Sequence, residues 1–214
     1  MNAWGPIRGP QAPSKIVVMG TSAGGLRALE NVLGGLPATF TLPIVVVQHR
    51  SKESEAFAEV LANLVKIPVR EAEDKDPILA PGVYIGPPDY HLMLEPGRFA
   101  LSTDDPVNFS RPSIDVMFES AADAYGPGVL AVLLTGANSD GTRGLVRIRN
   151  LGGYAIVQDP ATAESAEMPA AAIKEGAADK VIPLDDISKE LIRIAPARAR
   201  SPRVQREDSP KGTL

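Results

Sequence analysis

The sequence predicts a doubly wound α/β fold, with a mainly parallel sheet, helices on both faces and an inserted region of antiparallel hairpins. Short apolar runs recur along the chain, and segments with the three- and four-residue apolar spacing of helices fall between most of them. One stretch breaks this alternation with clustered turn residues. Strands that alternate with helices form parallel sheets covered on both faces, so the alternation predicts this class.

The first part of the chain supplies two strand–helix units. Residues 16–19 read IVVM and lead through GTSAGG into a helix expected at 26–33, where LRALENVL spaces its leucines and valine three and four apart. Residues 44–48 read IVVVQ and precede a helical pattern at 54–65. Two buried strands, each followed by a helix, are therefore expected.

The segment from 69 to 103 departs from the alternation. Strand-like pieces, including GVYI at 82–85, are separated by the turn signals APG, GPP and EPG, which predict antiparallel hairpins in or beside the sheet. The alternation then resumes. The remaining expected strands are 129–134, 154–158 and 180–182, and the remaining expected helices are 114–124, 142–150 and 169–175.

Length and charge narrow the class of protein. A chain of 214 residues with 44% hydrophobic content suits one domain with a sizeable core. We expect that domain at 15–194, because residues 1–14 and the basic, proline-containing tail 195–214 have the composition of segments without fixed structure. The formal charge is −4 and the tail is basic, so the domain is acidic and lacks the basic footprint of nucleic-acid-binding proteins.

The chain contains no cysteine, which excludes disulfides, thiol catalysis and thiolate metal sites. We expect no cofactor and no metal. The first residues contain no apolar run of signal-peptide length, and no segment approaches the roughly 18 apolar residues of a membrane span. We therefore expect a cytoplasmic protein that is not an integral membrane protein.

Three residues with complementary chemistry each follow a predicted strand: Ser22, His49 and Asp140. Ligands of open α/β sheets gather beyond the carboxyl ends of the strands, so these side chains are expected at one edge. A neutral imidazole can take the proton of a serine that attacks a carbonyl carbon, and a carboxylate on its other nitrogen fixes the tautomer. The pattern predicts a serine hydrolase, with amides at the glycine-flanked helix starts binding the oxyanion.

Each residue also has a structural interpretation. Ser22 can cap a helix, His49 can be a hydrogen-bonded interior residue, and Asp140 can form a turn or cap the helix that follows it. The other histidine, His91, falls in the hairpin-rich segment, where a hydrogen-bonding structural role is expected. Three separate coincidences at strand ends are less plausible than one shared site.

The glycine corner also allows a second hypothesis, a nucleotide- or phosphate-binding module without hydrolase activity. Against it, the glycines do not follow G-x-G-x-x-G, the second strand ends in QHR without an acidic residue, and no Lys-Ser or Lys-Thr pair follows the corner. The literal G-x-S-x-G matches the nucleophile elbow of α/β-hydrolases, but those enzymes place the acid before the histidine. The order Ser, His, Asp points to a different hydrolase scaffold.

Taken together, the motifs resemble the catalytic domain of the bacterial chemotaxis protein-glutamate methylesterases, the CheB family. The segments that carry the resemblance occur in order: MGTSAGG, VVVQHR, REAEDKDPILAPGVYIGPPDYHL, RPSIDVMFESAA, VLLTGANSDGTRG, GGYAIVQDPATAESAEMP and DKVIPLDDI. The resemblance covers nearly all of 15–194. It implies a mainly parallel sheet of about seven strands plus a hairpin.

The resemblance also implies roles for individual residues. Ser22 would be the nucleophile, His49 the base and Asp140 its orienting acid. A substrate or oxyanion region would include the four residues Ala23, Gly24, Arg111 and Ala137. Arg111 fits either this region or an ion pair at a helix entry. Ala23 and Ala137 depart from the family pattern, since Ala23 replaces a usual threonine and Ala137 a usual methionine.

The activity implied by the resemblance is hydrolysis of glutamate γ-methyl esters on chemoreceptors to glutamate and methanol, with a related deamidation of receptor glutamine. The partners would be the cytoplasmic domains of methylated chemoreceptors. The family normally carries an N-terminal receiver domain, whereas 14 residues precede the expected domain at 15–194 here. We therefore expect either a stand-alone esterase of a chemosensory system or part of a longer protein.

Overall fold

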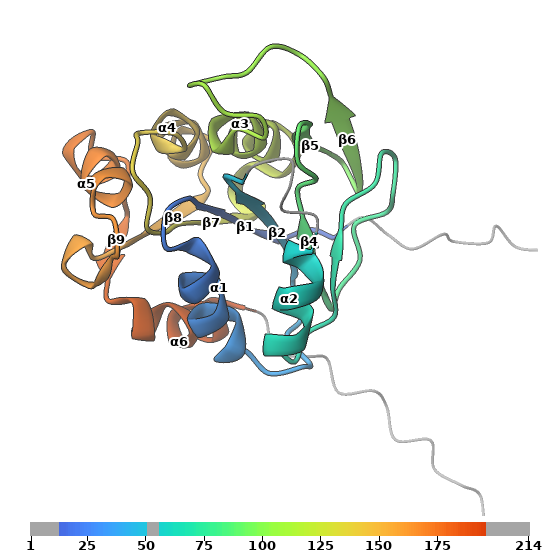
Figure 1. The fold of residues 1–214 in the computed structure, drawn as a ribbon, viewed down its shortest axis with the longest axis horizontal. Helices are drawn as coiled ribbons and strands as arrows, with labels where there is room; N and C mark the ends of the chain where they lie inside the picture. The colour runs from blue at the N-terminus through green and yellow to red at the C-terminus, as the bar shows by residue number, and fades with distance from the viewer. Residues whose placement is uncertain (1–12, 51–55, 196–214) are drawn as a thin grey trace, which may run out of the picture.

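A seven-stranded sheet runs through the centre of the computed structural model, which describes residues 13–50 and 56–195 (Figure 1). The strand order is β3-β4-β2-β1-β7-β8-β9, and every neighbouring pair is parallel. The strands are β1 (Ile16–Thr21), β2 (Pro43–Gln48), β3 (Val69–Glu71), β4 (Gly82–Ile85), β7 (Val129–Leu133), β8 (Tyr154–Gln158) and β9 (Lys180–Ile182). The predicted fold class is confirmed, including a main sheet of about seven strands.

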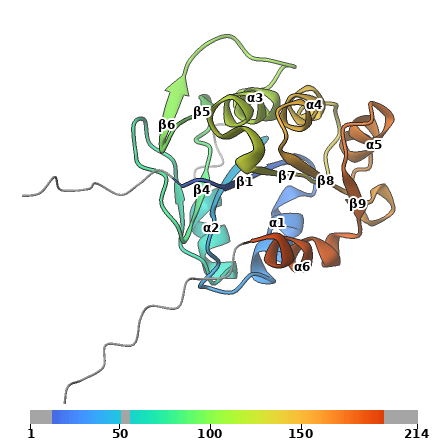
Figure 2. The same ribbon diagram turned by 180° about the vertical axis from the view of Figure 1, so that it is seen from behind.

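Helices cover both faces of this sheet, as Figures 1 and 2 show from opposite sides. One layer contains α1 (Gly25–Gly34), α2 (Phe57–Leu64) and α6 (Leu184–Ile194). The other contains α3 (Ile114–Tyr125), α4 (Thr142–Asn150) and α5 (Glu167–Lys174). Two short 3-10 turns, Gly126–Gly128 and Pro160–Thr162, join these elements to their neighbours.

The apolar runs form strands because both of their faces are buried. Along β1, Ile16 and Val18 pack into the core under α3, α4 and α5, whereas Val17 and Met19 pack into the core under α1, α2 and α6. Successive side chains of a strand point to opposite faces, so a strand between two helix layers is apolar at every position. This geometry explains why β1 reads as an unbroken apolar run.

The segment 69–103 contains one antiparallel hairpin, β5 (His91–Glu95) with β6 (Arg98–Ser102). It is joined by the predicted turn at Pro96 and Gly97, and Gly97 has a φ of +80°. The expectation of several hairpins is wrong for β3, which is a parallel edge strand of the main sheet beside β4. The chain enters β3 from α2, which follows β2, and residues 72–81, which contain no helix, then connect β3 to its parallel partner β4.

One helix, α6, is absent from the elements that the sequence predicts. Its signals are present, because Leu184, Ile187 and Leu191 have helical spacing and the first turn contains Asp185 and Asp186. Residues 1–12 and 196–214 of the predicted unstructured ends, and the start of the predicted helix at 54–65, lie outside the described residues. No helix in the described ranges is long and apolar enough to cross a membrane.

An ion-pair cluster fixes α6 to the sheet edge. Glu190 is 6% exposed, and its carboxylate lies 2.9 Å from Lys180 Nζ on β9 and 2.8 Å from Arg193 Nη2. The hydrogen bond from Arg193, only partly opposed by burial, is the main reason that the pKa of Glu190 lies at about 2. The ionised carboxylate therefore stabilises the fold at neutral pH.

We expect Glu190→Gln to lower the free energy of unfolding by about 1 kcal/mol at pH 7. Because the folded pKa is lowered, the stabilisation is present above the unfolded value of roughly 4.3 and is lost as the pH falls through about 2. Urea denaturation at several pH values measures it. The exposed Glu30 on α1 provides the control, Glu30→Gln. A difference between wild type and Glu190→Gln that does not shrink below pH 4 would contradict the prediction.

Candidate active site

The candidate site lies where the strand order reverses. The central strand β1 has β2 on one side and β7 on the other, so the chain builds the sheet outward from β1 in two directions. In open α/β sheets, ligands bind at such a switch point, beyond the carboxyl ends of the strands. Thr21 and Gln48 are register partners at the ends of β1 and β2. The next residues along these neighbouring strands are Ser22 and His49, and parallel strands lie about 4.8 Å apart. The structure thus brings two of the three predicted residues side by side.

Backbone contacts hold Ser22 in place. Its amide donates to the carbonyl of Thr135 at 2.9 Å, and its carbonyl accepts from the amide of Gly25 at 2.9 Å. Helix α1 begins at Gly25 with Gly24 as its N-cap and no side-chain capping bond, so Ser22 is not a capping residue. Within the described ranges the Ser22 hydroxyl has no hydrogen-bond partner, and the residue is partly exposed. Its hydroxyl is therefore available for chemistry.

The glycine corner is needed for close packing. Gly24 has a φ of +77°, a conformation that favours glycine. A Cβ atom on Gly25 would lie 1.8 Å from the side-chain oxygen of Gln48. Glycine at position 25 therefore allows the start of α1 to approach the end of β2.

Gln48 is a site residue that the sequence analysis missed. Its Nε2 atom donates to the carbonyls of both Ser22 and His49, at 2.8 Å each, and the side chain is 7% exposed. One amide thus holds the two strand ends together. The available signal was a polar residue that ends an otherwise apolar strand, PIVVVQ.

We expect Gln48→Ala to lower about tenfold the kcat of a reaction that uses Ser22 and His49, because small displacements of reacting groups carry a large cost in rate. The loss of both donated hydrogen bonds is also expected to lower the free energy of unfolding by about 1–3 kcal/mol. Gln48→Glu is the matched variant, since it keeps the size of the side chain but cannot donate. Steady-state kinetics and urea denaturation measure both effects. Full activity in both variants would show that Gln48 does not position the site.

His49 and Asp140 are in direct contact. His49 Nε2 lies 2.8 Å from Asp140 Oδ2, and their side chains are 12% and 0% exposed. The structure therefore joins His49, which follows β2, to Asp140, which lies in the loop between β7 and α4. Asp140 does not cap the helix that follows it, since the N-cap of α4 is Gly141 and has no side-chain bond. Its carboxylate instead faces the start of α3.

The Asp140 carboxylate accepts hydrogen bonds from several groups at the start of α3. Asp140 Oδ2 accepts from the amide of Ile114 at 2.7 Å, and Oδ1 accepts from the amide of Asp115 at 3.0 Å and from the hydroxyl of Ser113 at 2.9 Å. A helix N-terminus stabilises negative charge through its free amides and its dipole. The carboxylate is thus buried, and hydrogen bonds from these protein groups stabilise its negative charge.

The pKa of Asp140 reflects this environment. Burial works to raise the pKa, but the hydrogen bonds from His49 and from the amides of Ile114 and Asp115 bring it below the ordinary value. Burial and the charge of Asp140 raise the pKa of the neighbouring Asp115, although the Gly144 amide opposes this. Asp140 is therefore ionised at neutral pH and accepts only, so the proton of the shared bond sits on His49 Nε2.

Asn108 connects this carboxylate to the loop before α3. Its Nδ2 atom lies 3.0 Å from Asp115 Oδ2 and 3.3 Å from Asp140 Oδ1. Asn108 is not among the predicted site residues, because its partners Asp115 and Asp140 lie seven and 32 residues away and no local pattern indicates them. Asn108 therefore belongs to the set of groups that hold Asp140.

Two residues of the predicted oxyanion region, Ala23 and Ala137, can be placed relative to Ser22. A Cβ atom on Gly136 would lie 3.0 Å from the Cβ atom of Ser22, so the loop after β7 passes directly beside the serine and places Ala137 next to it in sequence. In the described part of the chain, the amides of Ala23 and Ala137 donate to no acceptor. Free amides near a serine are the donors that an oxyanion needs.

Arg111 is held by structural contacts. It pairs with Asp89 at 2.6 Å, and its Nη1 atom donates to the carbonyls of Thr103 at 2.8 Å and Asp104 at 3.1 Å. It also lines a pocket of about 350 Å³ together with His49. The expected ion pair is therefore present, at a position next to the candidate site.

His91 has the structural role that the sequence predicts. It is 2% exposed, its Nδ1 atom accepts from the amide of Ser113 at 3.2 Å, and its Nε2 atom lies 3.1 Å from the carbonyl of Asp105. An acceptor Nδ1 places the proton on Nε2, which donates to that carbonyl. His91 therefore ties the hairpin to the start of α3.

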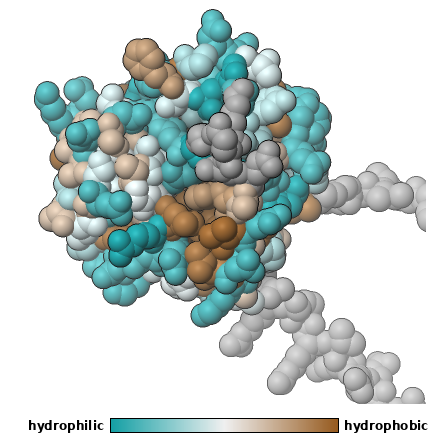
Figure 3. All heavy atoms as spheres, in the orientation of Figure 1, coloured by the Kyte–Doolittle hydropathy of each residue, from teal (hydrophilic) through white to brown (hydrophobic). Residues whose placement is uncertain are grey.

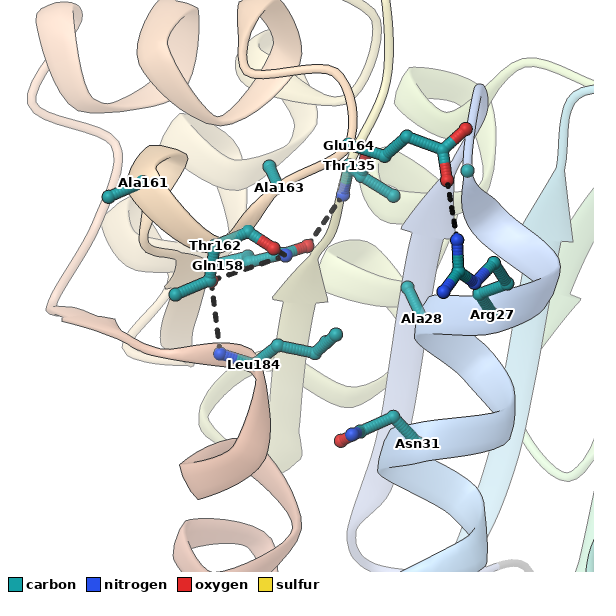
Figure 4. Close-up of a pocket in the computed structure, with 11 residues that line it drawn as sticks. Arg27, Ala28, Asn31, Thr135, Gln158, Ala161, Thr162, Ala163, Glu164 and Leu184 are labelled. Atoms are coloured by element: carbon teal, nitrogen blue, oxygen red, sulfur yellow. Dashed lines mark hydrogen bonds and ion pairs between the residues drawn. The ribbon is translucent and has the colours of Figure 1, made fainter.

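A second pocket, of about 440 Å³, is lined by Gly24, by residues of α1 and by the segment 161–164 (Figure 4). Figure 4 shows Arg27 of α1 and Glu164 facing each other across it, with a nitrogen–oxygen distance of 4.0 Å. A Cβ atom on Gly24 would lie 3.0 Å from Glu164 Oε2, so a carboxylate lies against the start of α1. That negative charge disfavours an anionic ligand there, and the phosphate-binding hypothesis is not favoured.

No group of three or more acidic, histidine or cysteine side chains in the residues that the structure describes could hold a metal ion. The groups described at the candidate site are a hydroxyl, an imidazole, a buried carboxylate and free amides.

Comparisons with known proteins agree on one family. The family model described as CheB methylesterase matches residues 17–191. A relative from Leptospira interrogans is 46% identical over 180 residues, which cover 83% of this chain and 93% of the relative. The protein-glutamate methylesterase/protein-glutamine glutaminase of Trichodesmium erythraeum is 40% identical over 184 residues, 84% of this chain and 52% of that protein. The chain thus spans about half the length of some curated relatives.

A solved structure gives the same result. The CheB methylesterase catalytic domain of Thermotoga maritima superposes with a TM-score of 0.81 at 38% identity, covering 85% of this chain and 98% of that one. The shared fold therefore includes nearly the whole of the solved domain.

Proposed function

This chain belongs to the CheB methylesterase family, and on that premise we propose that it is a serine hydrolase of glutamate γ-methyl esters. Its substrates would be methylated glutamates in the cytoplasmic domains of chemoreceptors, and its products glutamate and methanol. Its place of action would be the cytoplasm. Relatives that are named both methylesterase and glutaminase support the reaction class.

In this proposal Ser22 is the nucleophile, His49 the general base and Asp140 the group that orients the imidazole. The proton on His49 Nε2 is held by Asp140, which leaves Nδ1 as the free base. Nδ1 takes the hydroxyl proton as Ser22 Oγ attacks the ester carbonyl, and returns it to the methoxide as methanol leaves. Nucleophile and base contacts often tighten only when substrate is bound, which fits a serine hydroxyl without a partner here.

The acyl-enzyme then reacts with water. His49 takes a proton from the water molecule, the hydroxide attacks the acyl carbon, and Ser22 leaves with that proton, which regenerates the enzyme and releases glutamate. The amides of Ala23 and Ala137 would bind the oxyanion in both steps, and each such donor is worth about 2.7–4 kcal/mol. A glutamine side chain would form the same acyl-enzyme with ammonia as the leaving group.

The observation that carries the proposal is the contact between His49 and the buried, ionised Asp140. His49 follows β2 at the position that corresponds to Ser22 after the neighbouring strand β1. The test is methanol release from a purified methylated chemoreceptor fragment, measured in the headspace by gas chromatography. A fragment with glutamine at the modification sites measures ammonia in parallel. Methanol release that depends on this protein is expected, and no release from any methylated receptor would refute the proposed substrate.

A further inference from the structure

A tight turn carries the loop between β6 and α3 past the candidate site. The amide of Val107 donates to the carbonyl of Ser110 at 3.2 Å, and the amide of Ser110 donates back at 3.0 Å. The residues between them, Asn108 and Phe109, have φ values of +51° and +60°. Positive φ at both central positions is typical of type I′ turns, in which asparagine followed by glycine is preferred.

Phenylalanine is a poor choice for the second central position. The left-handed conformation crowds the Cβ atom of every residue except glycine, and bulky residues are rare in it. Phe109 gains nothing from packing either, because its relative exposure is 104%. Neither backbone preference nor packing among the described residues explains why phenylalanine occupies this position. Residues that conflict with their local backbone conformation are concentrated at functional sites.

The turn has fixed anchors on both sides of Phe109. Before it, the Asn108 side chain donates to Asp140, the carboxylate that contacts His49. After it, Arg111 pairs with Asp89 at 2.6 Å. The position of Phe109 is therefore tied to the groups that we propose carry out the reaction.

Phe109 also lines the pocket of about 350 Å³ that contains His49. The other lining residues are Arg50, Ser110, Arg111 and Pro112. Figure 3 shows a hydrophobic projection where Figure 1 draws the tip of the loop between β6 and α3. An exposed apolar side chain thus stands at the rim of the pocket.

We propose that Phe109 determines specificity by packing against an apolar side chain of the methylated protein substrate, next to the ester at His49. This inference rests on the proposed function. The shared pocket and the tie to Asp140 favour the substrate over any other partner, because a polypeptide that presents an ester to His49 must pass the rim. Aromatic residues that become buried on binding contribute strongly to affinity.

The experiment compares kcat/KM for a methylated receptor fragment with kcat/KM for p-nitrophenyl acetate, which is too small to span the rim. We expect Phe109→Ala to lower the ratio of the two by about tenfold, and Phe109→Leu to keep it within about threefold of wild type. Phe109→Gly is expected to lower the ratio equally while raising the melting temperature, because it relieves the left-handed backbone. Leu151→Ala, at an exposed apolar position beyond α4, is the control with an unchanged ratio.

A binding measurement on the methylated receptor fragment distinguishes a failure of this inference from a failure of the proposed function. The Ser22→Ala protein, with and without Phe109→Ala, is titrated against the uncleaved methylated fragment, and the double variant is expected to bind about tenfold more weakly. An unchanged ratio or equal binding overturns the role of Phe109 while leaving the esterase assignment intact. No methanol release by wild type refutes the esterase assignment, and weaker binding by the double variant then still supports the contact. No binding by either protein overturns the inference.

Discussion

Changing Ser22 to alanine is expected to lower methyl ester hydrolysis by roughly 10⁴- to 10⁶-fold, because the reaction loses its attacking oxygen. The residual rate over water would come from binding and from the amides of the oxyanion region. Methanol release under single-turnover conditions measures the change. A fluorophosphonate probe is expected to label wild type at Ser22 and to leave Ser22→Ala unlabelled.

The fold of this variant is expected to remain intact. The contacts that hold Ser22 run through its backbone, to Thr135 and Gly25, and its hydroxyl has no partner among the described residues. Ser188→Ala on α6, whose side chain lies against Gly35 at the end of α1 opposite to Ser22, is the matched control and is expected to retain full activity. A Ser22→Ala protein that still releases methanol, or still reacts with the probe, would remove Ser22 from the mechanism.

The sequence predicted the layers of this fold because its central strands are buried on both faces. The apolar runs at β4 and β8 match the observed strands residue for residue, since strands of a parallel sheet covered by helices are apolar at nearly every position. The edge strand β3 was not recognised as parallel, because it is three residues long and partly exposed, so its pattern resembles that of a hairpin. Pairing partners of such short strands depend on the tertiary fold.

The candidate site was predictable only in part, for a related reason. Ser22, His49 and Asp140 stand out because each follows a strand, and parallel strands share an edge. The groups that hold Asp140 do not share that pattern: the amides of Ile114 and Asp115 belong to a helix that precedes it by about 25 residues. Contacts between a loop and a distant helix start leave no periodicity in the sequence.

Asp140→Asn is expected to lower kcat by about 10⁴-fold, because the substitution allows His49 to adopt the wrong tautomer. An ionised carboxylate keeps the proton on Nε2 and leaves Nδ1 free to act as base. An asparagine can turn its NH2 group to His49, and Nε2 then becomes the acceptor while the proton moves to Nδ1. The ring would thus face Ser22 with a proton already in place. Methanol release across a pH series measures the loss.

The same change is expected to destabilise the protein by about 1–3 kcal/mol at pH 7, because one amide oxygen cannot replace two carboxylate oxygens. Asp140 accepts from His49, Ser113, and the amides of Ile114, Asp115 and Gly141. Since the folded pKa of Asp140 is lowered, its contribution is present above the unfolded value of roughly 3.9 and is lost as the pH falls through the folded one. The stability difference is therefore expected to shrink in acid.

The neighbouring carboxylate separates the two effects. Asp115 is as deeply buried as Asp140, but it contacts the amide of Gly144 and the side chain of Asn108 rather than His49. We expect Asp115→Asn to lower kcat by at most about tenfold, because the His49 tautomer is unaffected. Equal losses of activity in both variants would mean that the carboxylates act only by holding the start of α3. A large loss confined to Asp140→Asn requires that the contact with His49 itself supports the reaction.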